Sequence, residues 1–262
     1  MELKFITLSK GAAKEYSEYS FNSHTGCTNG CSYCYLKGLG MNHPPKPKKM
    51  LYDRDDNIFA AYKFVRCRYE PELEKLLEAD PELREKGILL SFATDPLLEE
   101  TLIYTKFVVI ANIEKYVITR LLTKRGVKEF QKFANFALDL DRDKEETQWQ
   151  LAHLHYGVTL TGFDDLEPNA APNMERIETL KLARENGFAT WVSLEPIIDF
   201  ETSLNMLKAS KDFVFYYKIG LQNRGIKYAQ DTALWFKSQV EELLPASKFT
   251  FKNSFKKLIG IE

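Results

Sequence analysis

Residues 18–35 read EYSFNSHTGCTNGCSYCY, and this stretch decides how the rest of the chain is interpreted. Its first six residues are typical of a short β-strand, and a cysteine-rich loop follows directly. The loop contains Cys27, Cys31 and Cys34, with three residues between the first two thiols and two residues between the last two. Thiolates are soft ligands that suit iron–sulfur clusters or zinc. The loop therefore predicts a metal centre after the first strand.

The spacing of the three thiols leaves more than one kind of centre open. Three cysteines would leave one iron of a four-iron cluster without a protein ligand, and an open iron can bind a cofactor. Gly26 and Gly30 would let the backbone wrap tightly round such a bulky group. A structural zinc site usually takes four ligands, so zinc would need His24, Cys67 or a remote histidine as well. A disulfide between two of the four cysteines is a further alternative.

Short apolar segments alternate with helical ones along the remaining chain. The segments typical of buried strands are GILLSFA (87–93), KYVITRLL (115–122), HYGVTLTG (155–162), FATWVSLEPI (188–197) and FVFYYKIGL (213–221). The segments with helical spacing are 58–66, 71–79, 126–138, 173–186 and 227–244. Together with the strand at 18–23, this alternation predicts an α/β fold, a partial (β/α)6 TIM-like barrel of parallel strands. A doubly wound sheet is the alternative, but the chain has no dinucleotide fingerprint and no phosphate-binding loop.

Length and charge limit the classes of protein that remain. The 262 residues are expected to form one domain (1–262), with a core over about 18–222 and a short C-terminal extension over about 223–262. The chain has 36 Lys and Arg against 37 Asp and Glu, a net charge of −1, which argues against a general electrostatic hold on nucleic acid. No apolar run is long enough to span a membrane and no secretory signal is visible, so a cytoplasmic protein without a membrane partner is expected.

The cysteine pattern also carries a resemblance. Cys-x3-Cys-x-Tyr-Cys directly after the first strand of a predicted partial barrel resembles the radical S-adenosylmethionine (SAM) superfamily, over roughly residues 18–222. The resemblance implies a [4Fe–4S] cluster on the three cysteines, SAM on the open iron, and Tyr33 in the cofactor site. One electron from a reductant such as flavodoxin or ferredoxin would cleave SAM to methionine and a 5′-deoxyadenosyl radical, which takes a hydrogen atom from the substrate.

The predicted strand at 87–93 runs into Ala93-Thr94-Asp95-Pro96, where the superfamily usually has a Gly-Gly-Glu-like turn. This departure resembles the Thr-Asp-Pro turn of the spore photoproduct lyase-like branch. It implies that Thr94 and Asp95 bind the cofactor, with Asp95 accepting a hydrogen bond from the SAM ammonium group. The alternative is an Asx-turn before a helix, without a ligand.

The same resemblance implies roles for two basic residues. It implies that Lys124 pairs with the methionyl carboxylate of SAM and that Arg176 belongs to the cofactor site. The alternatives are a solvated basic turn at Lys124 and a surface ion pair of Arg176 with Glu175 or Glu178.

Three further cofactor contacts are predicted from the ends of later strands. Thr159 and Thr161 alternate onto one face of a strand, where two hydroxyls could bond the ribose or carboxylate of SAM. Glu195 ends an otherwise apolar strand, and a carboxylate is costly to bury unpaired. Glu195 is therefore expected to face a ligand or a basic partner.

The substrate is predicted to be a small molecule. Lys218, Gln222 and Asn253 are candidate substrate contacts, with a solvated loop as the alternative for each. Cys67 matches in position the additional cysteine by which spore photoproduct lyase donates hydrogen, although a buried structural thiol is the alternative. The flanking Arg66 and Arg68 would lower the pKa of this thiol if they point toward it.

These observations lead to three functional hypotheses. The first is a radical SAM lyase acting on a small nucleobase-like substrate, for which queuine lyase, acting on a 7-deazaguanine base in queuosine salvage, is the candidate relative. The second is a nucleic-acid repair or tRNA-modifying enzyme of the same superfamily, with the Lys-rich segments 46–49 and 252–257 contacting phosphates. The third is a zinc-stabilised binding module without catalysis.

Overall fold

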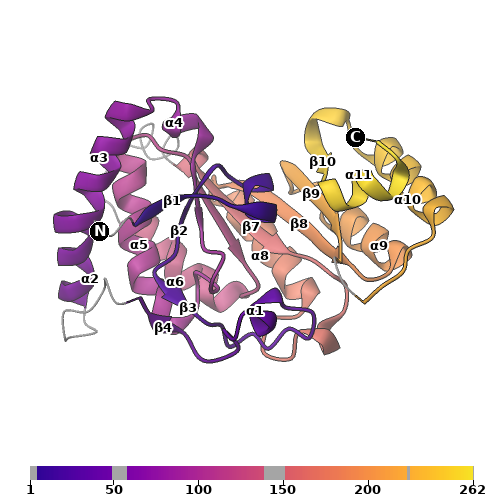
Figure 1. Cartoon of the computed structure of the whole chain (residues 1–262), viewed down its shortest axis with the longest axis horizontal. Helices are drawn as coiled ribbons and strands as arrows, with labels where there is room; N and C mark the ends of the chain where they lie inside the picture. The colour runs from indigo at the N-terminus through magenta and orange to yellow at the C-terminus, as the bar shows by residue number, and fades with distance from the viewer. Residues whose placement is uncertain (1–4, 49–57, 139–150, 223–224, 262) are drawn as a thin grey trace.

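The computed structural model describes residues 5–48, 58–138, 151–222 and 225–261 (Figure 1). One sheet has the strand order β1-β2-β5-β6-β7-β8-β9-β10, and its strands from β2 to β10 run parallel while β1 is antiparallel to β2. The strands of this sheet are β1 (Ile6–Leu8), β2 (Tyr19–Phe21), β5 (Ile88–Leu90), β6 (Thr119–Thr123), β7 (Leu154–Thr159), β8 (Ala189–Ile197), β9 (Tyr216–Leu221) and β10 (Phe249–Phe251). A separate antiparallel pair is formed by β3 (His24–Thr25) and β4 (Lys46–Pro47).

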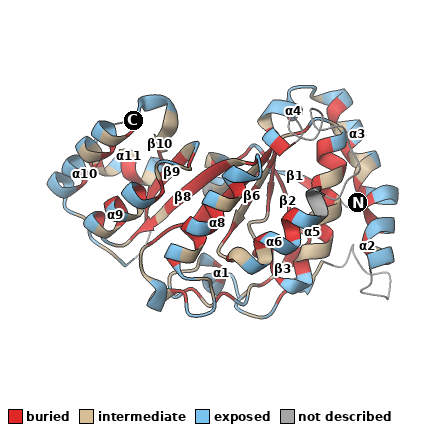
Figure 2. Ribbon diagram, turned by 180° about the vertical axis from the view of Figure 1, so that it is seen from behind, coloured by how far each residue is buried: buried red, intermediate tan, exposed pale blue. Residues whose placement is uncertain are grey.

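Helices cover the convex face of this sheet, as Figure 2 shows for α5, α6, α8 and α9. The α-helices are α1 (Tyr35–Gly38), α2 (Ile58–Phe64), α3 (Glu70–Ala79), α4 (Leu83–Lys86), α5 (Glu99–Glu114), α6 (Val127–Leu138), α8 (Asn173–Glu185), α9 (Phe200–Ser210), α10 (Gln230–Leu243) and α11 (Asn253–Ile259). Short helical turns are η1 (Gly11–Glu15), the π-helical η3 (Val65–Tyr69), η4 (Asp164–Leu166) and η5 (Ala246–Lys248). No helix in the described part of the chain combines the length and apolar character that crossing a membrane requires.

Alternation along each strand divides the side chains between two layers. In β6, Leu121 joins the large apolar core beneath the helices, whereas Leu122 packs with a small cluster on the concave face. Trp191 is the largest member of that small cluster. A Cβ on Gly157 of the neighbouring strand would overlap the Trp191 indole, so the indole lies flat against bare backbone. The concave face is thus partly filled by one aromatic side chain.

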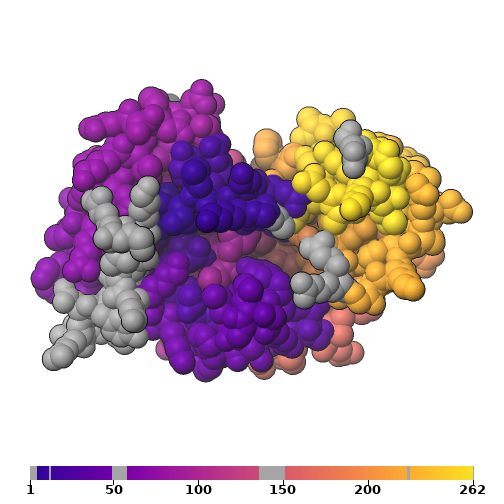
Figure 3. Space-filling view, viewed as in Figure 1, coloured from indigo at the N-terminus to yellow at the C-terminus, as the bar shows by residue number. Residues whose placement is uncertain are grey.

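The N-terminal segment crosses this concave face. From β1 it runs through η1 to Tyr16, which packs 5.9 Å from the Trp191 ring, centroid to centroid. Its far end reaches the C-terminal elements, because the backbone amide of Asn253 donates to Glu15 Oε1 at 2.6 Å. Figure 3 shows this segment bridging toward β10 and α11, with a hollow below it that is bounded by the region of α1.

The predicted partial barrel of parallel strands is confirmed, with a C-terminal strand and helix after it. The strand order is sequential from β2 to β10, so the doubly wound alternative is wrong. Among the described residues, the long helices α5 and α9 and the four-residue helices α1 and α4 lie where no helix was predicted. The predicted helices at 58–66 and 71–79 form one helical stretch, since the π-helical turn η3 joins α2 to α3.

Candidate active site

The cysteine loop connects β3 to α1 and lies at the carboxyl end of β5. Gly26 opens the loop with a φ of +94°, and its amide donates to the carbonyl of Ala93 at 2.9 Å. A Cβ at Gly26 would stand 2.5 Å from the carbonyl oxygen of His43, so both the dihedral and the space require glycine. This turn fixes where the three thiols leave the sheet.

The three thiols of the loop are all free. Cys31 is buried, whereas Cys27 and Cys34 are half-buried. Burial, with a smaller contribution from the Asp95 carboxylate, raises the pKa of Cys27 to about 12. Burial also raises the pKa of Cys31, although the Lys124 ammonium opposes this rise. Without a metal these buried thiols hold their protons, and a bound metal would have to displace them.

The loop that follows β7 is hydrogen-bonded to the cysteine loop. The amide of Ser32 donates to the carbonyl of Leu166 at 2.8 Å. Asn169 donates through its amide to the carbonyl of Asn29 at 3.2 Å, and through its side chain to that of Thr28 at 2.9 Å. The cysteine loop is therefore held from the carboxyl ends of β5 and β7 at once.

Asp95 joins three loops at this edge of the barrel. Its Oδ2 accepts hydrogen bonds from Asn29 Nδ2 and from the Lys124 amide, each at 2.8 Å. Its Oδ1 accepts from Thr123 Oγ1 at 2.7 Å and from the Leu97 amide at 3.0 Å. The last bond is the Asx-turn that was the alternative reading. Because a carboxylate offers about four lone-pair sites, chain donors already use the sites of Asp95, and its contact with an ammonium group stays a prediction.

The predicted threonines have different surroundings. Thr94 is buried, and its hydroxyl finds no hydrogen-bond partner among the described residues. Thr159 ends β7 and is buried. Thr161 is also buried, and its hydroxyl donates to Glu167 Oε2 at 3.3 Å. An orphaned buried hydroxyl is uncommon, so Thr94 is the threonine whose environment most needs a ligand.

Glu167 was not predicted from the sequence, yet it gathers four of the predicted side chains. Its buried carboxylate accepts from Arg176 Nη2 at 2.5 Å, from the Tyr33 hydroxyl and from Thr161. Lys124 Nζ lies 3.8 Å from Glu167 Oε1 and 5.6 Å from the centroid of the Tyr33 ring. Burial and the Glu167 carboxylate raise the pKa of Tyr33 well above its ordinary range. The cysteine loop, the residue that follows β6 and the helix α8 thus meet at one carboxylate.

Arg176 is fully buried, and the expected alternative of a surface ion pair is wrong. Beyond Glu167, its Nε donates to the carbonyl of Ala171 at 2.7 Å and its Nη1 to that of Thr159 at 2.8 Å. Each guanidinium nitrogen therefore has a partner within the chain. These bonds place Arg176 beneath the loop after β7, where it positions Glu167.

The cysteine loop carries the type of donor that an iron–sulfur cluster takes, although its thiols are not gathered around one point. Among the described residues, no group of three or more His, Cys, Asp or Glu side chains is arranged to hold a metal ion. The cysteine loop nevertheless supplies three free soft donors on one tight turn. Beside it lies a buried hydroxyl, that of Thr94, with no partner in the described chain.

A second polar network lies on the concave face of the barrel. Glu195 Oε2 accepts from Lys252 Nζ at 2.5 Å and from the Tyr16 hydroxyl. That hydroxyl also lies 2.7 Å from Ser193 Oγ, and Lys252 Nζ lies 3.4 Å from Glu15 Oε2. Glu195 thus has the basic partner that was one of its two expected environments.

The candidate substrate residues are not all in one place. The N-terminal segment joins two of them at Glu15, whose carbonyl accepts from Lys218 Nζ and whose Oε1 accepts from the Asn253 amide. Gln222 follows the end of β9, and its backbone amide donates to the Tyr228 hydroxyl at 3.0 Å. Lys218 is four residues earlier on the chain, about 13 Å along an extended strand. Lys218 and Gln222 therefore lie at different positions along the length of the barrel strands.

Cys67 lies exposed on the π-helical turn η3. Val65 and Tyr69 on the same turn are buried, and the Tyr69 hydroxyl donates to Asn112 Oδ1 at 2.7 Å. The alternative of a buried structural thiol is therefore wrong. In Figure 1, α2 and α3 on either side of this turn lie at the outer side of the barrel, whereas the cysteine loop lies beside α1. The role of Cys67 as hydrogen donor stays a prediction.

Solved structures share the open barrel of parallel strands with this chain at low sequence identity. A spore photoproduct lyase variant with bound SAM and dinucleoside spore photoproduct shares it at 15% sequence identity and a TM-score of 0.57, over 93% of this chain and 66% of that one. SuiB from Streptococcus suis bound to SAM shares it at 12% identity and a TM-score of 0.56, over 91% of this chain and 51% of that one. SuiB bound to the precursor peptide SuiA gives 12% identity, a TM-score of 0.57, and coverage of 92% and 50%.

This chain therefore spans about half to two thirds of the length of the solved proteins it matches. Neither a protein-family model nor a curated protein matches the sequence. The likeness is one of fold, and the residues of this chain must carry the functional argument.

Proposed function

We propose that this chain is a radical SAM enzyme. The observation that carries the proposal is the trio of free thiols on one tight loop at the carboxyl edge of an open parallel barrel. Cys27, Cys31 and Cys34 would ligate three irons of a [4Fe–4S] cluster and leave the fourth for the amino and carboxylate groups of SAM. The Thr94 hydroxyl, which is buried and has no hydrogen-bond partner among the described residues, supports a ligand beside this loop.

When bound, the cluster and SAM would supply a 5′-deoxyadenosyl radical by one-electron cleavage of the C5′–S bond, with methionine as the other product. Three side chains, those of Lys124, Thr94 and Thr159, would contact SAM. Lys124 lies near enough to the thiols to affect the pKa of Cys31, and would pair with the SAM carboxylate. The hydroxyls of Thr94 and Thr159 would bond polar groups of SAM.

Other predicted cofactor residues would act mainly by positioning. Asp95 fixes the backbone of Lys124, and Arg176 fixes Glu167 through a 2.5 Å ion pair. Glu167 in turn holds the Tyr33 hydroxyl and therefore the last turn of the cysteine loop. Such preorganisation keeps SAM and substrate in reacting geometry without movement during the reaction.

For the substrate, we infer a small nucleobase-like molecule and a lyase reaction, with queuine and related 7-deazaguanines as the candidates. The inference rests on the sequence resemblance and on the near-zero net charge of −1. Glu195 and Gln222 would read the hydrogen-bonding edge of such a base. The electron would come from a reductant such as flavodoxin or ferredoxin.

The experiment is anaerobic reconstitution with iron and sulfide, followed by incubation with SAM and dithionite. The product measured is 5′-deoxyadenosine, over a panel of bases, nucleosides and oligonucleotides. Cys31→Ala is expected to abolish it, because the cluster loses one of its three ligands. Cys67→Ala is the matched thiol control, since it removes a cysteine from the outer helical layer. It is expected to keep SAM cleavage.

If Cys31→Ala formed 5′-deoxyadenosine at the wild-type rate, the proposed mechanism would be wrong. Turnover with oligonucleotides alone, lost as salt rises, would replace the small substrate by a nucleic acid. A colourless protein with one zinc per chain would instead establish the zinc-stabilised binding module. A Cys67→Ala variant that cleaves SAM without completing turnover would support the hydrogen-donor role of this thiol.

A further inference from the structure

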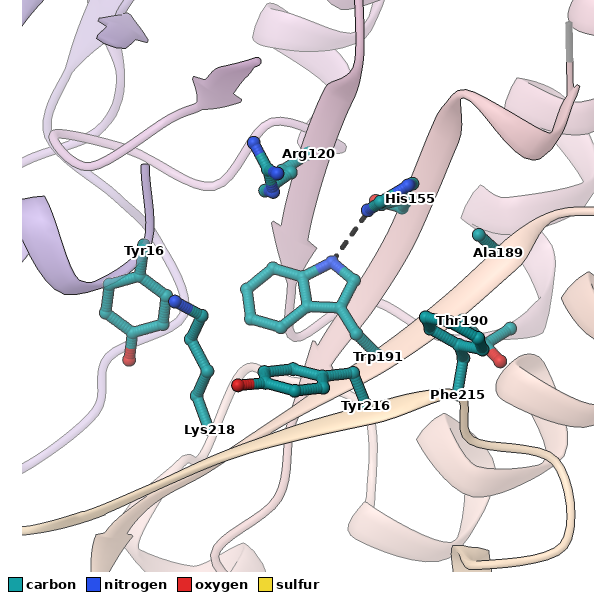
Figure 4. A pocket seen from close by; sticks show the side chains of 9 residues that line it. All are labelled: Tyr16, Arg120, His155, Ala189, Thr190, Trp191, Phe215, Tyr216 and Lys218. Carbon is teal, nitrogen blue, oxygen red and sulfur yellow. Dashed lines mark hydrogen bonds between the residues drawn. The ribbon is translucent and has the colours of Figure 1, made fainter. Parts of the chain in front are cut away.

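A cavity of about 220 Å³ opens at the amino ends of the barrel strands, the edge opposite the cysteine loop. Figure 4 shows the side chains that surround it, which come from β6, β7, β8, β9, the residue just before β9 and the N-terminal segment. The lining residues are Tyr16, Arg120, His155, Ala189, Thr190, Trp191, Phe215, Tyr216 and Lys218. Its volume is about that of seven liquid water molecules, which is enough for one ring with a small substituent.

Most of the residues that line this cavity lie near the starts of the barrel strands. Arg120, His155 and Ala189 are partners in register near the starts of β6, β7 and β8. Arg120 precedes Thr123, at the other end of β6, by three residues or about 10 Å. Between the two ends lies the apolar cluster of the concave face, which includes Leu89 and Trp191. The cavity therefore lies mainly at the starts of β6, β7 and β8, and Lys218 reaches it from the position on β9 that pairs with Ser193.

The charged groups of this cavity are all basic. Arg120 and Lys218 line it, and no aspartate or glutamate is among its lining residues. Within the described part of the chain their hydrogen bonds go to backbone carbonyls: Arg120 Nη1 donates to the carbonyl of Lys86 at 2.5 Å, and Lys218 Nζ donates to that of Glu15. Burial, together with the neighbouring Arg120 and Lys252, lowers the pKa of Lys218 to about 8. The Glu15 carboxylate, which is not among the lining residues, partly opposes the fall in the pKa of Lys218. Two partly buried cations on a lining without a carboxylate favour an anionic guest.

The rest of the lining is aromatic. Trp191 is held in place because its Nε1 donates to the carbonyl of His155 at 3.2 Å and its indole lies against Gly157. Tyr216 lies beside this indole in the close-up view (Figure 4). Burial lowers the pKa of His155 to about 4, so its imidazole is neutral near pH 7 and can donate one hydrogen bond and accept another. A rigid aromatic surface next to cations is suited to a planar guest.

We propose that this cavity is a binding site for a small planar organic anion, a single ring carrying a carboxylate or phosphate group. The anionic group pairs with Lys218 and Arg120, and the ring packs on Trp191 and Tyr216. The site does not depend on the proposed radical chemistry, because every residue it uses lies outside the cysteine loop and outside the loop after β7 that is hydrogen-bonded to it. Its ligand class differs from that of SAM, which has a sulfonium centre.

The test is isothermal titration calorimetry on the full chain, without SAM or reductant, using benzoate, phenyl phosphate, inorganic phosphate and the neutral analogue benzamide. Benzoate or phenyl phosphate is expected to bind at least tenfold more tightly than benzamide and than inorganic phosphate. Lys218→Met is expected to weaken that binding at least tenfold, and Lys218→Arg to retain most of it. Lys208→Met, at an exposed position of α9, is the control and should leave binding unchanged.

Three results would overturn the proposal. The first is the absence of binding by both ring anions at millimolar concentration. The second is equal binding of benzoate and benzamide. The third is unchanged binding in Lys218→Met, whose folding is checked by its far-UV circular dichroism. None of these results bears on cluster assembly, so a failure here leaves the proposed function to its own experiment.

Discussion

Removing the negative charge of Glu167 is expected to destabilise the chain strongly. Its side chain and that of Arg176 are both fully buried and lie 2.5 Å apart. Breaking a buried ion pair by neutralising one partner costs about 3–5 kcal/mol, since the other charge stays buried without compensation. Glu167→Gln keeps an amide oxygen for the guanidinium, so we expect the lower end, about 3 kcal/mol.

The assay is urea unfolding of the reduced apoprotein, followed by circular dichroism. A loss of about 3 kcal/mol should lower the midpoint by about 1–2 M with an unchanged slope. Glu178→Gln is the matched control, because Glu178 is exposed on the same helix as Arg176 and should change stability by less than about 0.5 kcal/mol. The double variant with Arg176→Met should show a coupling of about 2 kcal/mol.

The reasoning is refuted if Glu167→Gln unfolds at the same urea concentration as Glu178→Gln. A large loss with no coupling to Arg176 would refute it in another way, by showing that the ion pair is not the cause. A second readout follows from the hydrogen bond between Tyr33 and Glu167. Because this bond holds the cysteine loop, Glu167→Gln should also reduce the iron retained after anaerobic reconstitution.

Three further predictions concern single positions. Gly157→Ala should cost about 1–3 kcal/mol in urea unfolding, since its methyl group would overlap Trp191, whereas Gly38→Ala, with nothing within 4 Å of a new Cβ, should be nearly neutral. The pKa of Lys218 is about 8 in the folded chain against an ordinary 10.5, so the unfolded chain holds more protons between these values and wild-type stability rises with pH there. The stability advantage of Lys218→Met over wild type, as free energy of unfolding, should therefore be about 1–2 kcal/mol larger at pH 7 than at pH 10.5. An equal advantage at both pH values would contradict the lowered pKa. Thr94→Val should leave apoprotein stability unchanged or slightly higher, because the hydroxyl has no partner among the described residues. The same variant should bind SAM about tenfold more weakly by calorimetry. Unchanged SAM affinity would remove Thr94 from the site.

The barrel could be predicted from the sequence because parallel strands are buried on both faces. Segments such as 188–197 are then nearly continuous apolar runs, and β8 occupies 189–197. The helix α5 was missed for a related reason. Its residues EETLIYTKFVVIANIE are apolar around much of the helix and rich in β-branched types, because it packs between the sheet and other helices. Periodicity alone does not separate such a buried helix from a strand.

The site was predictable where a local motif marks it and unpredictable where it depends on tertiary contacts. Cys27, Cys31 and Cys34 share one loop, so their proximity is a property of the sequence. Glu167 gathers partners from the cysteine loop, from the residue after β6 and from α8, and nothing local distinguishes it from the neighbouring Asp164 and Asp165. Pairing across the barrel is decided by strand order and helix packing, which no local pattern encodes.

The most direct measurement of the central claim is electron paramagnetic resonance of the anaerobically reconstituted and reduced protein, together with its iron and sulfide content. The account predicts about four iron and four sulfide per chain, and a cluster spectrum that changes when SAM is added, because SAM binds an iron that no side chain occupies. A spectrum insensitive to saturating SAM, or one metal ion per chain without sulfide, would contradict it.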